Sequence, residues 1–373
     1  MCQRSTSLAL IVMLLTVVGI VLFLELILRL FPVNEGLRSM AVTENSPIFR
    51  YTPHRKSIWS KGWNFSIVNE VHTNNFGFIS EIDYDPAAPG PLLAIVGDSY
   101  IEAAMVPHHE TAPALLNKEL VGKGRVYGFG ASGSALSQYL AYAEYARDIF
   151  HPEALVVLVV GNDFDESLLR YKSVPGFHYF AEQASGELRL IRIDREVPPW
   201  REVFTRSSLA MYLAANLEIG HVFERVKELV QSSPSRAGRY VGNTSASANP
   251  IRIAESLRGV DAFINMLPVK AGLMPKKILL VIDAVRPDMY DPAARQDAES
   301  TYFGLMRRHF LAKASAAGFE VIDMETEFRE DHTVTGRRYE YPTDTHWNNA
   351  GHEVFARAVQ RSAVYRSFYA AAQ

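Results

Sequence analysis

One short segment of the chain is apolar at every position. Residues 154–160 have the sequence ALVVLVV. They lack the alternation of polar and apolar side chains that is typical of a strand with one solvent-exposed face. A strand with two apolar faces is typical of a parallel sheet that helices cover on both sides. The segment therefore predicts a central strand of an α/β fold.

Strand-like and helix-like segments alternate around this strand. Four further short apolar runs end in turn residues, and apolar residues at helical spacing fill the stretches between them. This alternation is typical of βαβ crossovers and predicts an α/β domain with a five-stranded parallel sheet and helices on both of its faces. The expected strands are residues 91–96, 125–129, 154–160, 277–285 and 319–324, and the expected helices are residues 111–121, 134–150, 251–267 and 298–317.

The remaining stretches define the expected domain organisation of the 373 residues. Residues 33–91 are polar and aromatic and end in a proline-rich turn, so we interpret them as a connector that packs on the main domain. The main domain follows at residues 92–373. Prolines and a Ser/Gly/Asn-rich segment interrupt it at about 165–257, which we interpret as a partly helical insertion. We expect one principal core.

The first residues have the composition of a membrane anchor. No charge occurs in residues 8–24, and the apolar run continues beyond Glu25, which gives about the 20 residues that a spanning helix needs. Glu25 and Arg29 are four residues apart and can pair on one helical face near the membrane surface. We therefore expect a transmembrane helix within residues 1–32, ended by Pro32.

A cleaved signal peptide is the alternative, because Arg4 followed by an apolar stretch fits that plan as well. The stretch is long for a signal peptide, and no A-x-A-like cleavage site follows it. Arg4 and the free amine favour a cytoplasmic N-terminus, whereas Arg29 and Arg38 beyond the helix oppose it. We expect the body of the protein outside the inner membrane, in the periplasm.

Composition excludes several classes of function. A net charge of −3 provides no basic field for nucleic-acid phosphates, so nucleic acid is not an expected partner. Cys2 is the only cysteine, which excludes an internal disulfide and a cysteine-rich metal site. Apolar residues make up 48% of the chain and are sufficient for a large buried core.

Polar residues follow the expected strands at the points where these strands end. Ligands of open α/β sheets bind beyond the carboxyl ends of the strands, so these residues are the candidates for chemistry. Ser99 follows the first strand, Gly130 the second and Asn162 the third. Asp344 and His346 come after the fifth strand.

These residues include the parts of a nucleophilic site. A serine hydroxyl attacks a carbonyl carbon only when a base removes its proton, and the base works better when a carboxylate orients it. Ser99, His346 and Asp344 can fill these three roles. The oxyanion that forms needs fixed donors, for which Ser99 N–H, Gly130 N–H and the Asn162 side chain are candidates. We expect neither a cofactor nor a metal ion to be needed.

The same residues and their neighbours resemble the four sequence blocks of the SGNH (GDSL-like) hydrolase superfamily. A Gly-Asp-Ser block, a glycine block, a Gly-Asn-Asp block and a late Asp/His block occur in the family's order. The resemblance covers about residues 92–363 outside the insertion. It implies a flavodoxin-like α/β/α domain whose site consists of Ser99, Gly130, Asn162 and His346, with Asp344 as the orienting acid.

Two features depart from the common family pattern. Only Thr345 separates Asp344 from His346, where two residues are usual. The resulting Asp-x-His-Trp-Asn form is similar to that of membrane-associated members and of polysaccharide O-acetyltransferases of the alginate type. Gly128 stands where many members carry asparagine, so we expect a supporting hydrogen bond to be missing there.

Other polar residues have simpler interpretations. Asp98 and Asp163 are expected to be structural, and His352 to lie on the final helix without binding a metal. The adjacent histidines at 108–109 are interpreted as solvated loop residues. Arg286 is expected in a surface salt bridge, with contact to an anionic substrate group as the alternative.

The sequence thus predicts a serine esterase or acyltransferase that forms an acyl-enzyme on Ser99. The anchor and the family resemblance together favour an O-acylated, most simply acetylated, carbohydrate of the cell envelope as its substrate. Hydrolysis and transfer use the same intermediate, so both remain open, as does the oligomeric state. A non-catalytic envelope protein that binds or assembles polysaccharide is the alternative from another class.

Overall fold

The computed structural model describes residues 2–120, 122–219, 249–286, 288–291, 298 and 300–371. The chain forms two compact units, which we call the N-terminal unit and the sheet unit. The N-terminal unit comprises Met1–Arg38, Lys56–Val71 and Val197–Pro234, and the sheet unit comprises Ser39–Arg55, His72–Glu196 and Ser235–Gln373. The expected connector is therefore shared between the units, since residues 39–55 and 72–91 belong to the sheet unit.

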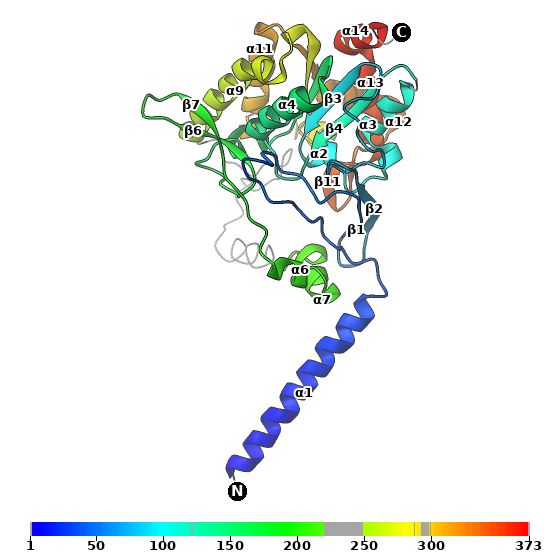
Figure 1. Cartoon of the computed structure of the whole chain (residues 1–373), viewed down its shortest axis with the longest axis vertical. Coiled ribbons are helices and arrows are strands. Elements are labelled where there is room, and N and C mark those ends of the chain that lie inside the picture. Colours follow the sequence, from blue (N-terminus) through cyan, green and yellow to red (C-terminus); the bar gives the residue numbers. More distant parts are fainter. Residues whose placement is uncertain are drawn as a thin grey trace. The chain divides into compact units, whose positions relative to one another are not determined.

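A five-stranded parallel sheet forms the centre of the sheet unit (Figure 1). Its strand order is β4-β3-β5-β8-β9, which is order 2-1-3-4-5 when only these strands are numbered along the chain. That order is the flavodoxin-like one, so the predicted fold class is confirmed. The strands are β3 (Leu92–Gly97), β4 (Arg125–Gly130), β5 (Ala154–Val159), β8 (Ile278–Ile282) and β9 (Glu320–Asp323).

The central strands are buried at every position because helices cover both faces of the sheet. Leu93 and Ile95 of β3 belong to a core cluster shared with the helices of one face, and the alternate residues of β3 are buried against the other face. The first face carries α3 (Ala112–Glu119), α12 (Met324–Thr335), α13 (Asn349–Arg361) and α14 (Ala363–Ala371), and the second carries α4 (Leu136–Phe150), α9 (Pro250–Ala271) and α11 (Tyr302–Ala316).

Capping residues define the ends of the long helix α9. The Asn249 side chain accepts hydrogen bonds from two backbone N–H groups of the first turn, and Pro250 occupies the first helical position. The helix ends at Gly272, which has a φ of +64°. This left-handed conformation costs little for glycine. Asn249 and Gly272 thus make the helix begin one residue before and end four residues after the expected range.

Short antiparallel hairpins, which the sequence pattern did not indicate, supplement the main sheet. The expected insertion contains the hairpin of β6 (His178–Glu182) and β7 (Leu188–Arg192). A further hairpin, β10 (Glu340–Tyr341) and β11 (Asp344–Trp347), follows α12. The remaining short elements of the sheet unit are α2 (Ser99–Glu102), α5 (Asp163–Glu166) and the 3-10 turns His108–Glu110, Pro275–Lys277 and Asp288–Tyr290.

The N-terminal unit is built around α1 (Cys2–Leu28). Its segment Ser7–Leu28 is long and apolar enough to cross a membrane, a property that it shares with signal sequences. Glu25 near the end of α1 accepts hydrogen bonds from Ser207 Oγ and from the N–H groups of Ser208 and Leu209. The other elements are β1 (Arg55–Lys61), β2 (Ile67–Thr73), α6 (Trp200–Phe204), α7 (Ser208–Met211) and the π-helix Tyr212–Asn216.

Candidate active site

The nucleophile candidate lies on a tight turn at the carboxyl end of β3. Asp98 caps the short helix α2 by accepting a hydrogen bond from Tyr100 N–H at 2.9 Å, which confirms its expected structural role. Ser99 is therefore the first residue of that helix, and its side chain lies at the carboxyl edge of the sheet. This edge is where open α/β sheets bind their ligands.

Ser99, His346 and Asp344 form a continuous hydrogen-bonded relay. Ser99 Oγ lies 2.8 Å from His346 Nε2, and His346 Nδ1 is bonded to Asp344 Oδ1. A carboxylate oxygen only accepts hydrogen bonds, so Nδ1 carries the ring proton and Nε2 is left to accept the serine proton. The backbone N–H of His346 also donates to Asp344 Oδ1 at 2.9 Å, which fixes the carboxylate relative to the ring.

The serine hydroxyl has a second possible acceptor. Ser99 Oγ lies 3.2 Å from Asp98 Oδ2, farther than from the histidine nitrogen. Burial raises the pKa of Asp98 to about 6. The shorter contact and the basic nitrogen favour His346 as the proton acceptor.

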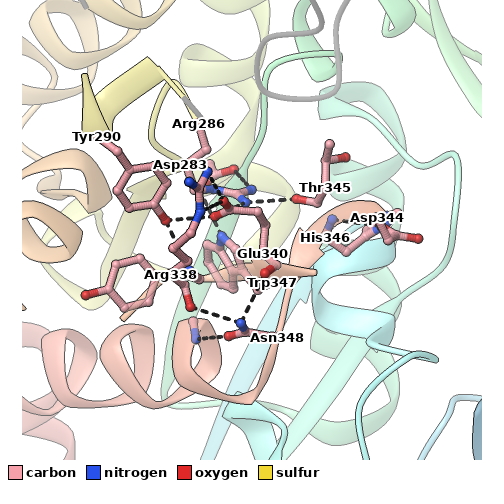
Figure 2. Close-up of polar contacts among 12 residues, drawn as sticks. Asp283, Arg286, Tyr290, Arg338, Glu340, Asp344, Thr345, His346, Trp347 and Asn348 are labelled. Atoms are coloured by element: carbon pink, nitrogen blue, oxygen red, sulfur yellow. Dashed lines mark hydrogen bonds and ion pairs between the residues drawn. The ribbon is translucent and has the colours of Figure 1, made fainter. Parts of the chain in front are cut away.

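A buried polar network holds the strand that carries the relay (Figure 2). Arg286 donates to the carbonyl of Thr345 at 2.8 Å and to Asp283 at 2.7 Å. It also donates to the hydroxyl of Tyr100, the residue after the nucleophile, at 2.8 Å. Asp283 in turn accepts from the indole N–H of Trp347 at 3.0 Å. One guanidinium therefore connects the nucleophile turn with the backbone between Asp344 and His346.

The expectation of a surface salt bridge at Arg286 is wrong. Its side chain is 2% exposed and that of Asp283 is fully buried. Both residues follow β8, and the β10–β11 hairpin lies beside them (Figure 2). A periodic sequence pattern could not indicate that the hairpin covers Arg286, because the hairpin is about 60 residues away in sequence.

Further contacts close the hairpin itself. Glu340 of β10 accepts from Tyr290 Oη at 2.7 Å and from Arg338 Nε at 2.7 Å. The Asn348 side chain donates to the carbonyls of Arg338 and Glu340 at 2.9 and 3.2 Å (Figure 2). The Trp-Asn pair that follows His346 therefore anchors the strand on both sides, a role that the sequence alone did not reveal.

Gly130 packs against the nucleophile turn at the end of β4. A Cβ atom at this position would lie 2.8 Å from the carbonyl oxygen of Asp98 and 2.9 Å from the backbone nitrogen of Glu102. Both are backbone atoms that cannot move without moving Ser99. The structure therefore requires glycine at this position for close approach to the nucleophile turn.

Asn162 lies one strand away at the same edge of the sheet. It precedes α5, and its side-chain amide donates to Glu166 at 3.2 Å. Glu166 also accepts from Lys172. Among the residues that the structure describes, no hydrogen bond joins Asn162 to Ser99 or His346. Glu166 uses one of the two hydrogens of the Asn162 amide.

Glu102 is a buried acid at the site that the sequence analysis missed. It is 3% exposed and accepts hydrogen bonds from Tyr51 Oη and from both the hydroxyl and the backbone N–H of Ser132. Burial raises its pKa to about 7. Glu102 thus connects α2 to the glycine block. An acid three residues after the nucleophile was the available signal, but its partners are distant in sequence.

Two histidines outside the relay, His352 and His108, serve the fold. His352 on α13 is fully buried and its Nδ1 accepts a hydrogen bond from Ala112 N–H at 3.2 Å. Burial lowers its pKa to about 3. His108 was expected to be solvated, but its side chain is only 15% exposed and lies 3.3 Å from Ser80 Oγ. Within the described part of the chain, no cluster of three or more His, Cys, Asp or Glu residues could hold a metal ion.

The two other expectations at the strand ends can be compared with the structure. Asp163 is buried and accepts from Tyr139 Oη at 2.9 Å and from Val160 N–H at 2.7 Å, so its expected structural role is confirmed. Gly128 was expected to lack the supporting bond that an asparagine side chain gives, and this stays a prediction. Its backbone N–H donates to Tyr84 Oη at 3.0 Å, and its carbonyl accepts from Tyr84 Oη at 2.9 Å.

No family model and no curated protein matches this sequence. Solved structures with a similar fold, all at low sequence identity, include ester hydrolases. They include an α/β hydrolase enzyme, LAE5, from the metagenome of Lake Arreo, Spain (17% identity, 77% of this chain and 99% of that chain, TM-score 0.37). Another is the acetyl xylan esterase AlAXEase (12% identity, 73% of this chain and 99% of that chain, TM-score 0.39). A third is a member of the lipolytic G-D-S-L family from Veillonella parvula (10% identity, 74% of this chain and 98% of that chain, TM-score 0.38).

Proposed function

We propose that the chain is an SGNH-type serine ester hydrolase or O-acyltransferase that works through an acyl-enzyme on Ser99. The observation that carries this proposal is the relay from Ser99 Oγ through His346 to Asp344. The 2.8 Å contact between Ser99 Oγ and Nε2 has the geometry required for proton transfer in the ground state. The buried carboxylate on Nδ1 fixes the tautomer that accepts the proton.

The first half-reaction transfers the acyl group to the enzyme. Ser99 Oγ attacks the carbonyl carbon of the ester while His346 Nε2 takes its proton, and Asp344 stabilises the imidazolium that results. The tetrahedral intermediate then collapses as His346 returns that proton to the departing alcohol. General base catalysis of this kind contributes roughly 10²- to 10⁴-fold to the rate.

Three donors are suited to the oxyanion of the intermediate. Ser99 N–H lies at the start of α2, where helical N–H groups have no partner within the helix. Gly130 N–H and the second amide hydrogen of Asn162 come from the neighbouring strand ends. Removing one such donor typically lowers kcat by about 10²- to 10³-fold.

The second half-reaction releases the acyl group. His346 deprotonates an incoming hydroxyl, which attacks the acyl carbon and displaces Ser99 Oγ, which recovers its proton. If the hydroxyl belongs to water the enzyme is an esterase, and if it belongs to a sugar the enzyme is an acyltransferase. No cofactor enters either route. We propose an acetylated carbohydrate of the cell envelope as the acyl donor or product.

The proposed location is the membrane, with the catalytic unit in the periplasm. Support comes from α1, which is apolar over Ser7–Leu28 and contributes a side chain to the fold of its own unit. Three hydrogen bonds to Glu25 satisfy the start of α7. A helix with such a structural role favours an uncleaved anchor over a removed signal peptide.

Covalent labelling with a fluorophosphonate probe tests the proposal. We expect the full chain in detergent to be labelled and Ser99→Ala to remain unlabelled, since the probe reacts with an activated serine. Thr111→Ala, which alters another buried hydroxyl, is the matched control and should be labelled like the wild type. An unlabelled wild type beside a reactive control esterase would favour the non-catalytic polysaccharide-binding module instead.

A further inference from the structure

The N-terminal unit exposes large apolar side chains where α1 ends. Leu30 is 83% exposed, Trp63 72%, Trp200 64% and Val203 70%. Single exposed apolar residues are normal, but a group of them marks a contact surface. These residues come from three segments of the unit that are distant in sequence.

Aromatic contacts tie one of these segments, the turn between β1 and β2, to the chain that leaves α1. The rings of Phe31 and Phe65 are stacked, with their centroids 5.8 Å apart. The centroids of the Phe65 and Tyr212 rings are 5.7 Å apart. The Tyr212 hydroxyl donates to the carbonyl of Trp63 at 2.8 Å. The turn between β1 and β2 and the π-helix are therefore fixed beside the end of α1.

The third segment, which contains α6, is held near the end of α1 by Glu25. Its carboxylate binds the N-terminus of α7 three residues before α1 ends, and α6 immediately precedes α7 (Figure 1). On α6, Trp200, Val203 and Phe204 have the i, i+3, i+4 spacing of a single helical face, and all three are exposed. An apolar face of α6 is thus fixed near the end of the apolar helix.

The backbone of the turn between β1 and β2 is strained. Phe65 has a φ of +56°, a left-handed conformation that is unusual for a bulky side chain. Such conformations are strained and persist where the surroundings enforce them, often at functional positions. Here the strained turn presents Trp63 to solvent while Phe65 joins the aromatic stack.

We propose that these residues form a collar that is seated in the headgroup region of the bilayer that α1 spans. The inference rests on the proposed membrane anchor. The occupant follows from continuity, because Leu30 and Phe31 extend the exposed apolar surface of α1 directly into the collar. Tryptophan favours the membrane–water interface. The collar consists of Leu30, Phe31, Trp63, Trp200, Val203 and Phe204.

Charged residues around the collar fit the same occupant. Arg29, Arg201 and Arg206 are exposed, and their guanidinium groups can reach lipid phosphates. Glu202 is also exposed and pairs with Arg206. The collar would hold the N-terminal unit on the membrane surface in addition to the single spanning helix.

Quenching of tryptophan fluorescence by lipid tests this proposal on the full chain. The protein is reconstituted in vesicles of phosphatidylcholine and phosphatidylglycerol, with or without bromine on the acyl chains near the headgroup. Two of the four tryptophans, Trp63 and Trp200, belong to the collar, whereas Trp347 is fully buried. We expect brominated lipid to quench part of the emission. That quenching should disappear in the double variant W63F/W200F and persist in the matched control W59F.

Flotation of the same vesicles separates the two claims. A chain that floats with the vesicles but is quenched equally in wild type and W63F/W200F overturns the collar and leaves the anchor intact. Unquenched tryptophans in a cross-linkable dimer would assign the surface to a second copy and also overturn the proposal. A chain that does not float overturns the anchor, and the collar with it.

Discussion

At the scale of single residues, the site depends on groups whose ionisation or size admits few replacements. The relay needs the ring proton of His346 on Nδ1, and the buried carboxylate of Asp344 holds it there. Gly130 and Glu102 both shape the turn around Ser99, one through the absence of a Cβ atom and one through a buried carboxyl. Each leads to a prediction.

Gly130→Ala should reduce the rate of fluorophosphonate labelling by about 10²-fold, because even a small displacement of a nucleophile costs this much. The new Cβ atom would lie within 2.9 Å of two backbone atoms of the nucleophile turn. The matched control is Gly259→Ala on α9, whose Cβ atom would be 3.5 Å from its nearest neighbour. Equal labelling rates in both variants would contradict the packing role of Gly130.

Glu102→Gln should change how stability depends on pH. Burial raises the pKa of Glu102 to about 7, so the folded state keeps a proton that the unfolded state releases above its ordinary pKa of about 4.3. Stability from this group is complete at low pH and is lost as the pH rises through about 7. The variant cannot ionise at this position, so its free energy of unfolding relative to that of the wild type should rise by at most about 3 kcal/mol from pH 5 to pH 8.

Urea unfolding at the two pH values measures this difference. Glu187→Gln, in the exposed turn between β6 and β7, is the control for the chemical change itself. If the difference between wild type and Glu102→Gln were the same at pH 5 and pH 8, the raised pKa of Glu102 would be refuted.

At the scale of elements, the β10–β11 hairpin delivers the histidine and the acid to a serine that is 247 residues away from His346 in sequence. The hairpin has few residues of its own, so its position depends on the loop after β8. The buried Asp283–Arg286 pair supplies that support through Thr345, Trp347 and Tyr100. We regard Arg286 as a positioning residue because it acts on the relay through these neighbours.

Arg286→Met should lower the free energy of unfolding by about 3–5 kcal/mol, because it leaves Asp283 buried without its cation. We also expect kcat for an aryl acetate to fall more than KM changes, since the histidine would be misplaced while the substrate surface remains. Arg338→Met is the matched control. Arg338 belongs to the same hairpin region, but its side chain is 57% exposed, so its ion pair is worth at most about 1 kcal/mol.

The measurements are urea unfolding and steady-state kinetics on the same preparations. The positioning role would be refuted if Arg286→Met and Arg338→Met had equal kcat values. Arg286→Lys provides a further check on geometry, because an ammonium group cannot reproduce the fork of donors that reaches Asp283, Tyr100 and Thr345 together.

At the scale of the whole molecule, the central sheet could be predicted from sequence and the small elements could not. The continuous apolar run at β5 indicated its central position, and the glycines and polar residues after β3, β4 and β5 indicated the edge that carries the site. The local sequence pattern is sufficient for the central strands, because the apolar composition of each strand by itself predicts that the strand is buried. The sequence predicted Ser99 from its place at the end of a strand, and Asp344 and His346 from the chemistry of their side chains; the structure brings the three side chains together.

The missed features depend on contacts between distant segments. The buried Arg286, the partners of Glu102 and the bonds of Tyr84 to Gly128 all join residues that are far apart in sequence. The strands β1 and β7 have half-buried residues without a clear alternation of buried and exposed positions. His346 was expected directly after the fifth strand, whereas α12 and a separate hairpin intervene.

Intact-mass and peptide mass spectrometry of the acid-quenched protein, immediately after mixing with para-nitrophenyl acetate, can detect the acyl-enzyme itself. We expect one acetyl group on the peptide that contains Ser99, and none in Ser99→Ala. Rapid ester turnover by the wild type with no acetylated Ser99, or with the acetyl group on another residue, would contradict it.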